Sequence, residues 1–232
     1  MSLLVQIVAS LSSLYLLLSP ISLLRQISAA KTTGSHGVAP LLWTHIAYVV
    51  WLIYSLCVGV FFPYISTNMI SAPVSVVYLV IFYKHSPEKT RLRPVYGATT
   101  VCLASLATYV ALSTEPWDVV TRHVGVVAIV CAAVMVAAPL SVLRDVVRTQ
   151  SSALLPRKIM LATLVSNGAW MLTGLLHADM IIVIPNAFNL GLGLLQMTLF
   201  LWYPSSPADA AATDALLHFD AKDIDATMDV VH

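Results

Sequence analysis

Long apolar segments separated by short polar ones recur along the whole chain. Seven can be marked, at residues 3–24, 38–58, 64–83, 94–113, 123–143, 159–176 and 180–203. A helix needs about 20 mostly apolar residues to cross the hydrocarbon of a bilayer, and each segment is close to that length. The pattern predicts seven transmembrane helices. A tail from residue 204 follows, with six aspartates among many alanines, and we expect it to be disordered.

Composition agrees with a membrane protein. Hydrophobic residues make up 59% of the chain and charged residues 10%, whereas an ordinary soluble domain is about 25% charged. The net charge of +1 suggests no nucleic-acid partner. Cys57, Cys102 and Cys131 fall in separate apolar segments, so we expect small core residues rather than metal ligands. No metal-ligand cluster, glycine-rich phosphate loop or nucleophile triad is visible, so we expect neither a cofactor nor an enzyme.

Basic residues separate the two sides of the membrane. Among the loops, only Arg122 lies in the second, fourth or sixth, and ten basic residues lie in the first, third and fifth. Cytoplasmic loops collect Lys and Arg, so we expect the N-terminus outside and the tail in the cytoplasm. No retention motif is visible, which favours the plasma membrane, with an endomembrane as the alternative. The ten are Arg25, Lys31, Lys84, Lys89, Arg91, Arg93, Arg144, Arg148, Arg157 and Lys158.

The chain repeats itself. Residues 19–25 and 138–144 read alike at a spacing of 119 positions (138 − 19). A tryptophan in the next segment repeats at the same spacing, and an asparagine in the segment after it repeats at 118 positions (186 − 68). The matched pairs are Pro20 and Pro139, Trp51 and Trp170, and Asn68 and Asn186.

This duplication predicts the domain organisation. Segments one to three and five to seven form equivalent units, and the fourth segment is a linker. The predicted boundaries are 1–93 for the first three-helix bundle, 94–121 for the linker helix, 122–203 for the second bundle and 204–232 for the tail. The first and fifth segments cross in the same direction, so the two repeats are parallel.

Three duplicated motifs together resemble a known family. They are a Ser-Pro or Ala-Pro at the end of the first helix, a Trp-x-x-Tyr/Thr in the second and an Asn or Pro-Asn in the third. Over about residues 3–203 the chain is similar to the SWEET sugar transporters, built from MtN3/saliva repeats, which are themselves a known example of parallel repeats. The resemblance implies an all-α fold of two three-helix bundles and a linker helix. It also implies alternating access to a site near mid-bilayer and a possible homo-oligomer.

The two matched asparagines are the first candidate site residues. A buried amide offers two donors and two acceptor lone pairs, which suits a polyol. By resemblance, Asn68 and Asn186 bind the substrate. The alternative is that both amides form interhelical hydrogen bonds worth about 0.6 kcal/mol each.

The matched tryptophans are the second candidate pair. The C–H face of a pyranose can stack on an indole, and resemblance places Trp51 and Trp170 around the sugar. The alternative is plain packing. Ala47 and Ser166 lie four residues before these tryptophans, on the same helix face. Asn167 beside Ser166 is either a further site residue or a helix–helix contact.

Prolines suggest where the helices bend. Pro185 is expected to break the last helix, and Pro73 to kink the third, where no proline precedes Asn68. Resemblance implies four hinge prolines near the cytoplasmic side, two of which could instead be ordinary first-turn prolines. The four are Pro20, Pro139, Pro40 and Pro156, the last two being the possible first-turn prolines.

Two bulky residues bear on substrate size. Leu16 and Met135 lie one turn before Pro20 and Pro139. Resemblance suggests that both line the cavity, where their bulk would favour a monosaccharide over a disaccharide.

The segments also bear on energy coupling. No Asp or Glu lies well inside any of them, and His45 is the only well-embedded histidine. Proton-coupled carriers usually need such groups, and a lone histidine is more often a packing residue. We therefore expect a bidirectional, uncoupled carrier of a monosaccharide such as glucose. Alternatives are a PQ-loop carrier of another small solute, or a seven-helix receptor, although the repeat argues against the receptor.

Overall fold

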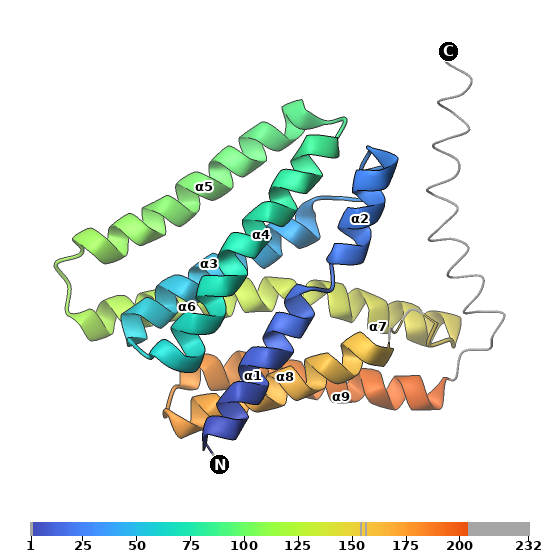
Figure 1. Ribbon diagram of the computed structural model, residues 1–232. Coiled ribbons are helices and arrows are strands. Elements are labelled where there is room, and N and C mark those ends of the chain that lie inside the picture. Colours follow the sequence, from blue (N-terminus) through green and yellow to red (C-terminus); the bar gives the residue numbers. More distant parts are fainter. Residues whose placement is uncertain (1, 154, 156, 204–232) are drawn as a thin grey trace.

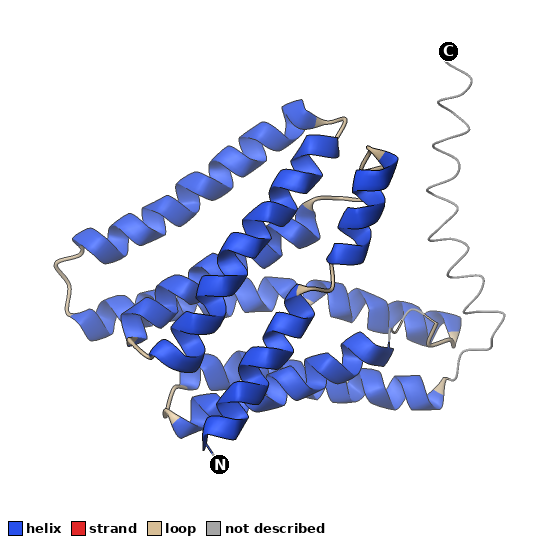
Figure 2. Ribbon diagram, viewed as in Figure 1, coloured by secondary structure: helices blue, strands red, loops and turns tan. Residues whose placement is uncertain are grey.

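The protein is described by a computed structural model that covers residues 2–153, 155 and 157–203, so the acidic tail lies outside the described residues. All regular structure there is helical (Figure 2). Seven helical stretches are long and apolar enough to cross a membrane. The elements are α1 (Ser2–Leu17), α2 (Ile21–Ala30), α3 (Ala39–Val58), the π-helical turn η1 (Phe61–Ile65), α4 (Ser66–His85), α5 (Lys89–Leu112), α6 (Trp117–Met135), α7 (Ala137–Thr149), α8 (Arg157–Leu176) and α9 (Met180–Trp202).

The two repeats pack against each other crosswise (Figure 1). Within the halves, α4 packs on α3 and α9 packs on α8. Between them, α1 packs along α8 and α3 packs along α6. The sequence repeat makes α1 equivalent to α6 and α3 equivalent to α8, so these two interfaces are related by the exchange of the halves. A pseudo-twofold axis therefore runs between the halves, and the 3+1+3 arrangement expected from the sequence is present.

The linker helix α5 lies on the flank of the molecule (Figure 1). It contacts α4 through a hydrogen bond from the Tyr96 hydroxyl to the Leu79 carbonyl, 3.3 Å long. It also packs against α3, where Leu103, Leu106 and Val110 are partly buried, and its remaining surface is exposed. Cys102 lies on that exposed surface, so the expectation that all three cysteines are core residues is wrong for this one. The reason is that a helix packed along one edge leaves most of its side chains outside the bundle.

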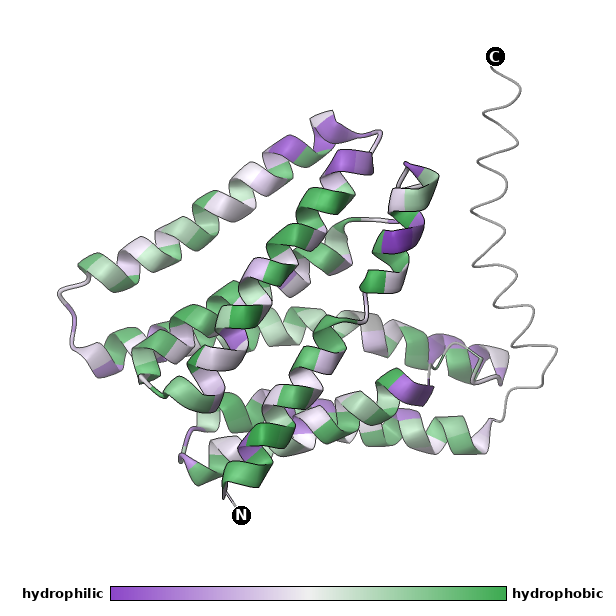
Figure 3. Ribbon diagram, in the orientation of Figure 1, coloured by the Kyte–Doolittle hydropathy of each residue, from purple (hydrophilic) through white to green (hydrophobic). Residues whose placement is uncertain are grey.

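Many large apolar residues are exposed on the outside of the bundle, and hydrophilic residues gather at helix ends (Figure 3). Leu112 and Leu201 are 74% and 73% exposed. Such surfaces are favourable in lipid, where helices satisfy their own backbone hydrogen bonds. The interior can then be more polar than the surface.

Two of the transmembrane stretches are interrupted. α1 ends at Leu17, and Pro20 is the N-cap of α2, so the first stretch extends to Ala30 instead of ending at residue 24. In the second half the interruption lies at Val136, and Pro139 is in the first turn of α7. A proline is tolerated there because its missing N–H would have had no helical partner.

Pro185 does not break the last helix, contrary to the sequence prediction. It is the sixth residue of α9, which runs without interruption from Met180 to Trp202. The proline removes one backbone hydrogen bond, near the N-terminal end of the helix. The side chain of Asp179 caps that end, and the remaining turns keep α9 continuous.

α4 is continuous through Pro73, so the kink expected there stays a prediction. The irregular backbone lies earlier, in η1, where Phe62 has φ −114° and ψ 131°. The third helix of each half therefore begins differently. In the first half the π-helical turn η1 precedes α4, and in the second half α9 begins directly at its cap, Asp179.

Candidate functional site

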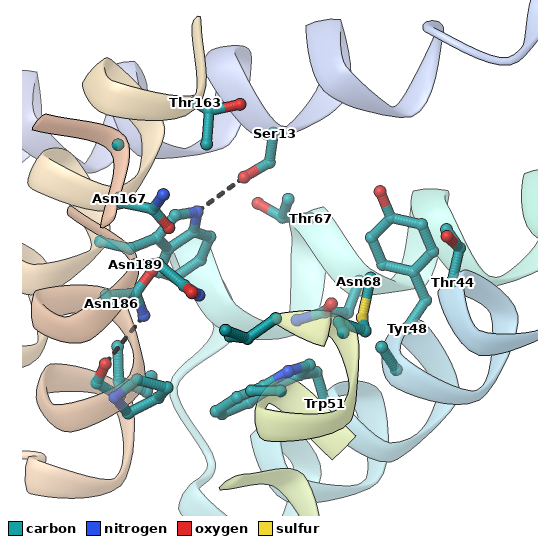
Figure 4. A pocket seen from close by; sticks show the side chains of 18 of the residues that line it. Ser13, Thr44, Tyr48, Trp51, Thr67, Asn68, Thr163, Asn167, Asn186 and Asn189 are labelled. Atoms are coloured by element: carbon teal, nitrogen blue, oxygen red, sulfur yellow. Dashed lines mark hydrogen bonds between the residues drawn. The ribbon is translucent and has the colours of Figure 1, made fainter. Parts of the chain in front are cut away.

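A cavity of about 360 Å³ lies between the two halves. Helices of both repeats line it, and all four asparagines of the chain are among the lining residues (Figure 4). The volume is at the lower end of the range of about 300–1,000 Å³ typical of small-molecule sites. None of the lining side chains is Asp, Glu, Lys, Arg or His, so the cavity is polar and aromatic without a formal charge.

The predicted asparagine pair lines this cavity from opposite halves. Asn68 Nδ2 donates to the Tyr64 carbonyl at 2.9 Å, and Asn186 Nδ2 donates to the Ile182 carbonyl at 2.8 Å. Asn68 Nδ2 also lies 3.3 Å from Ser55 Oγ. Both amide nitrogens are thus tied to the carbonyl one turn before them. Neither Oδ1 accepts a hydrogen bond among the described residues, which leaves two acceptors in the cavity.

The tryptophan pair also lines the cavity, with unequal surroundings. Trp170 Nε1 donates to Ser13 Oγ of α1 at 2.6 Å, a bond that crosses between the halves. Trp51 stands edge-on to Tyr54, at 5.7 Å between ring centroids. Trp170 is therefore held by a hydrogen bond from the opposite half, whereas Trp51 is held by packing, both against Tyr54 and against a cluster that includes Ala128 of the second half.

The remaining predicted residues divide into lining and supporting groups. Ala47 and Met135 line the cavity. Ser166 is buried and its Oγ lies 3.3 Å from Ser13 Oγ, so it supports the serine that holds Trp170 and does not line the cavity itself. Leu16 is half-buried in the last turn of α1 and is also absent from the lining.

The four prolines have different positions. Pro139 lines the cavity, whereas Pro20 lies in the interruption between α1 and α2. Pro40 occupies the first turn of α3, and Pro156 lies outside the described residues. His45 Nδ1 lies 2.9 Å from Ser75 Oγ of α4, a hydrogen bond between helices of the kind expected for a packing residue.

Contacts between the halves that sequence reasoning missed lie beside one end of the cavity. This end carries the loops at 59–60, 113–116 and 177–179 and is called the outer end. The Tyr54 hydroxyl donates to Asp179 Oδ1 at 2.8 Å and joins the two halves. The same oxygen accepts from Ile181 N and Ile182 N, at 3.1 and 3.3 Å. The sequence signal was weak, because Asp179 reads as an ordinary loop charge and helix cap.

Tyr64 also lies at the outer end. Its ring is 1% exposed and lies between Trp170 and His177, at centroid distances of 5.9 and 5.3 Å. Its hydroxyl is buried without a hydrogen-bond partner among the described residues, as is Asp179 Oδ2. The outer end therefore contains a hydrogen bond between the halves beside buried polar atoms, Tyr64 Oη and Asp179 Oδ2 among them, that have no hydrogen-bond partner within the described residues.

Three further amides line the cavity beyond the predicted pair. Asn167 was recognised in the sequence only as an undecided polar residue, and Asn189 and Gln196 were missed. All three lie on α8 or α9. The available signal was helical spacing, because Asn189 follows Asn186 by three residues and so shares its face.

Comparison with known proteins identifies similar chains. The model of a family described as sugar efflux transporters for intercellular exchange matches residues 3–90 and 122–208. The rice (Oryza sativa subsp. japonica) bidirectional sugar transporter SWEET16 is 29% identical over 206 residues, which cover 86% of this chain and 61% of the relative. Arabidopsis thaliana SWEET7, also a bidirectional sugar transporter, is 30% identical over 209 residues, covering 87% and 80%.

A solved structure is similar as well. A eukaryotic SWEET transporter superposes with a TM-score of 0.79 at 25% identity, covering 88% of this chain and 97% of that one. This chain spans about three fifths to two thirds of the length of the rice relatives SWEET16 and SWEET11, at 61% and 65%.

Proposed function

This chain belongs to the family of sugar efflux transporters for intercellular exchange, and on that premise we propose that it carries a monosaccharide across a membrane, in either direction and down its gradient. It is an integral multi-pass membrane protein of a family of transporters, not enzymes. The observation that carries the proposal is the uncharged cavity between the halves, with an asparagine of each half facing into it.

The cavity chemistry supports a neutral polyol. The free Oδ1 atoms of Asn68 and Asn186 can accept hydrogen bonds from sugar hydroxyls. Trp51 and Trp170 present flat faces for the apolar side of a pyranose. An amino acid or an ion would instead call for a charged partner, and the lining has none. The same lack of carboxylate, basic and histidine side chains in the lining supports uncoupled transport.

The geometry supports alternating access. While the Tyr54–Asp179 hydrogen bond is formed, the outer end is closed. The residues that line the cavity extend toward the opposite end of the bundle as far as Gln196. Opening the outer end requires this bond to break while the other end closes. The interruptions at Pro20 and Val136 are positions at which α2 and α7 can move relative to α1 and α6.

Orientation, domains and assembly follow from the sequence predictions. We place the N-terminus and the outer end outside and the tail in the cytoplasm, with the plasma membrane as the location. We assign 1–93 and 122–203 as the moving bundles and 94–121 as the linker. A homo-oligomer stays a prediction of the family resemblance.

Tracer uptake into proteoliposomes tests the proposal. Wild-type protein should equilibrate glucose faster than sucrose, because Met135 lines the cavity and we expect its bulk to leave less room for a disaccharide. Asn68→Ala and Asn186→Ala should each lower glucose uptake, since a lost hydrogen bond of about 0.5–1.5 kcal/mol corresponds to roughly a two- to twelvefold change. Thr198→Ala is the matched control, because this exposed hydroxyl of α9 bonds only to its own helix.

Three outcomes would contradict the proposal. Full glucose uptake by both asparagine variants would refute the assignment of Asn68 and Asn186 to the binding site. Faster entry of sucrose than of glucose would refute the assignment of a monosaccharide as substrate. Accumulation of sugar above equilibrium under an imposed pH gradient would remove the uncoupled mechanism.

A further inference from the structure

A second amide of α9, Asn189, reaches into the cavity beside the asparagine pair. It lies three residues after Asn186 and therefore on the same face of the helix. Figure 4 shows its amide in the cavity near those of Asn167 and Asn186. Among the described residues it has no hydrogen-bond partner, so both donors and both acceptor lone pairs are available.

The first half has no equivalent of this residue. The spacing that matches Asn186 with Asn68 places position 71 opposite Asn189 (189 − 118). Ser71 is there, but it is 0% exposed and its hydroxyl donates to the Thr67 carbonyl at 2.8 Å. It does not line the cavity. The amide of Asn189 thus breaks the pseudo-twofold symmetry of the site.

A second position breaks the symmetry in the same direction. Asn167 on α8 is matched by Tyr48 on α3 (167 − 119), and both line the cavity. Asn167 also makes no hydrogen bond among the described residues. At these two positions the second half presents a free amide, and the first presents a tyrosine side chain or no lining side chain. At two other matched lining pairs, Ser13 with Ala132 and Thr67 with Pro185, the first half is the more polar, so the free amides are what the second half alone adds.

The amides of α9 differ in what they offer a ligand. Asn186 has its nitrogen bound to Ile182 and presents an acceptor, whereas Asn189 can both donate and accept. Residues three apart on a helix have Cβ atoms about 5–6 Å from each other, a spacing that neighbouring hydroxyls of one sugar ring can bridge. One edge of a pyranose can therefore contact both side chains at once.

We propose that Asn189 is a specificity-determining residue that binds a second hydroxyl of the sugar. The sugar then lies off the pseudo-twofold axis, with its hydroxyl-rich edge on α9 and its apolar face toward Trp51. This inference rests on the proposed sugar transport. The inference predicts that Asn189 recognises one particular hydroxyl of the sugar, and that Asn68 and Asn186 recognise other hydroxyls.

Monodeoxy analogues of glucose test this assignment in proteoliposomes. KM is measured for glucose and for each monodeoxyglucose with the wild type and with Asn189→Ala. We expect one analogue to have a KM raised about three- to tenfold in the wild type, the range of one lost hydrogen bond. Asn189→Ala should raise the glucose KM by the same factor and abolish discrimination against that analogue alone.

Two further variants make the result decisive. Asn189→Ser keeps a hydrogen-bonding group and should recover part of the lost discrimination, and it gives a second readout if the alanine variant folds poorly. Thr198→Ala, exposed on the same helix, should leave every KM unchanged. An unaltered discrimination pattern in Asn189→Ala, or an equal rise in KM for all analogues, overturns the inference. Absence of sugar transport by the wild type overturns the proposed function itself.

Discussion

Replacing Tyr54 with phenylalanine removes one hydrogen bond from the outer end of the cavity and little else. The lost bond joins the Tyr54 hydroxyl to Asp179 Oδ1 at 2.8 Å and connects the two halves. The carboxylate keeps its bonds from Ile181 N and Ile182 N, so the cap of α9 survives. A hydrogen bond to a charged group contributes about 1.5–3 kcal/mol. Since about 1.4 kcal/mol is tenfold, the outward-open population should rise roughly 10- to 100-fold.

The native Cys57 reports this opening. It is 5% exposed and packs in one cluster with Tyr54 and Tyr64. Cys102→Ser and Cys131→Ala leave it as the only thiol of the chain. A membrane-impermeant maleimide added from the outside should then label Cys57 in proportion to the outward-open population. The Tyr54→Phe variant should label about 10- to 100-fold faster than the same chain with Tyr54.

Tyr96→Phe is the matched control for this experiment. It also removes one tyrosine hydrogen bond, to the Leu79 carbonyl, but this bond lies between α5 and α4 and not across the halves. Its labelling rate should stay unchanged. An unchanged rate in Tyr54→Phe would refute the assignment of Tyr54 and Asp179 as the outer closure. An equal increase in Tyr96→Phe would show general loosening instead.

Three other substitutions test other parts of the site. Tyr64→Phe should slow Cys57 labelling roughly 5- to 150-fold, because the closed state then loses an unpartnered buried hydroxyl that costs about 1–3 kcal/mol; faster labelling would contradict this reading. Ser13→Ala should raise the sugar KM roughly two- to tenfold by releasing Trp170, whereas Ser12→Ala, whose hydroxyl bonds only within α1, should not. His45→Gln should retain downhill uptake at unchanged rate, because His45 packs against Ser75; lost uptake would assign His45 to transport.

Much of the architecture could be predicted from the chain alone. Segment lengths near 20 residues predicted the seven helical stretches, and the 119-residue spacing predicted their division into two equivalent halves. The same pairing also pointed to residues that now line one cavity, namely Trp51, Trp170, Asn68 and Asn186. Helix detail was less predictable. Pro185 was expected to break α9, and yet one missing backbone bond near a capped end was tolerated.

Only the tertiary structure showed how the site is closed and why it is asymmetric. Tyr54 and Asp179 are 125 positions apart, and Ser13 and Trp170 are 157 apart. Membrane spans can be predicted because the bilayer imposes one length and one polarity on every segment, and a duplication repeats its spacing. A hydrogen bond between distant helices depends on their relative rotation and depth, which leave no period in the sequence. For the same reason Asn189 reads as one more polar residue until α9 is packed and its free amide is found in the cavity.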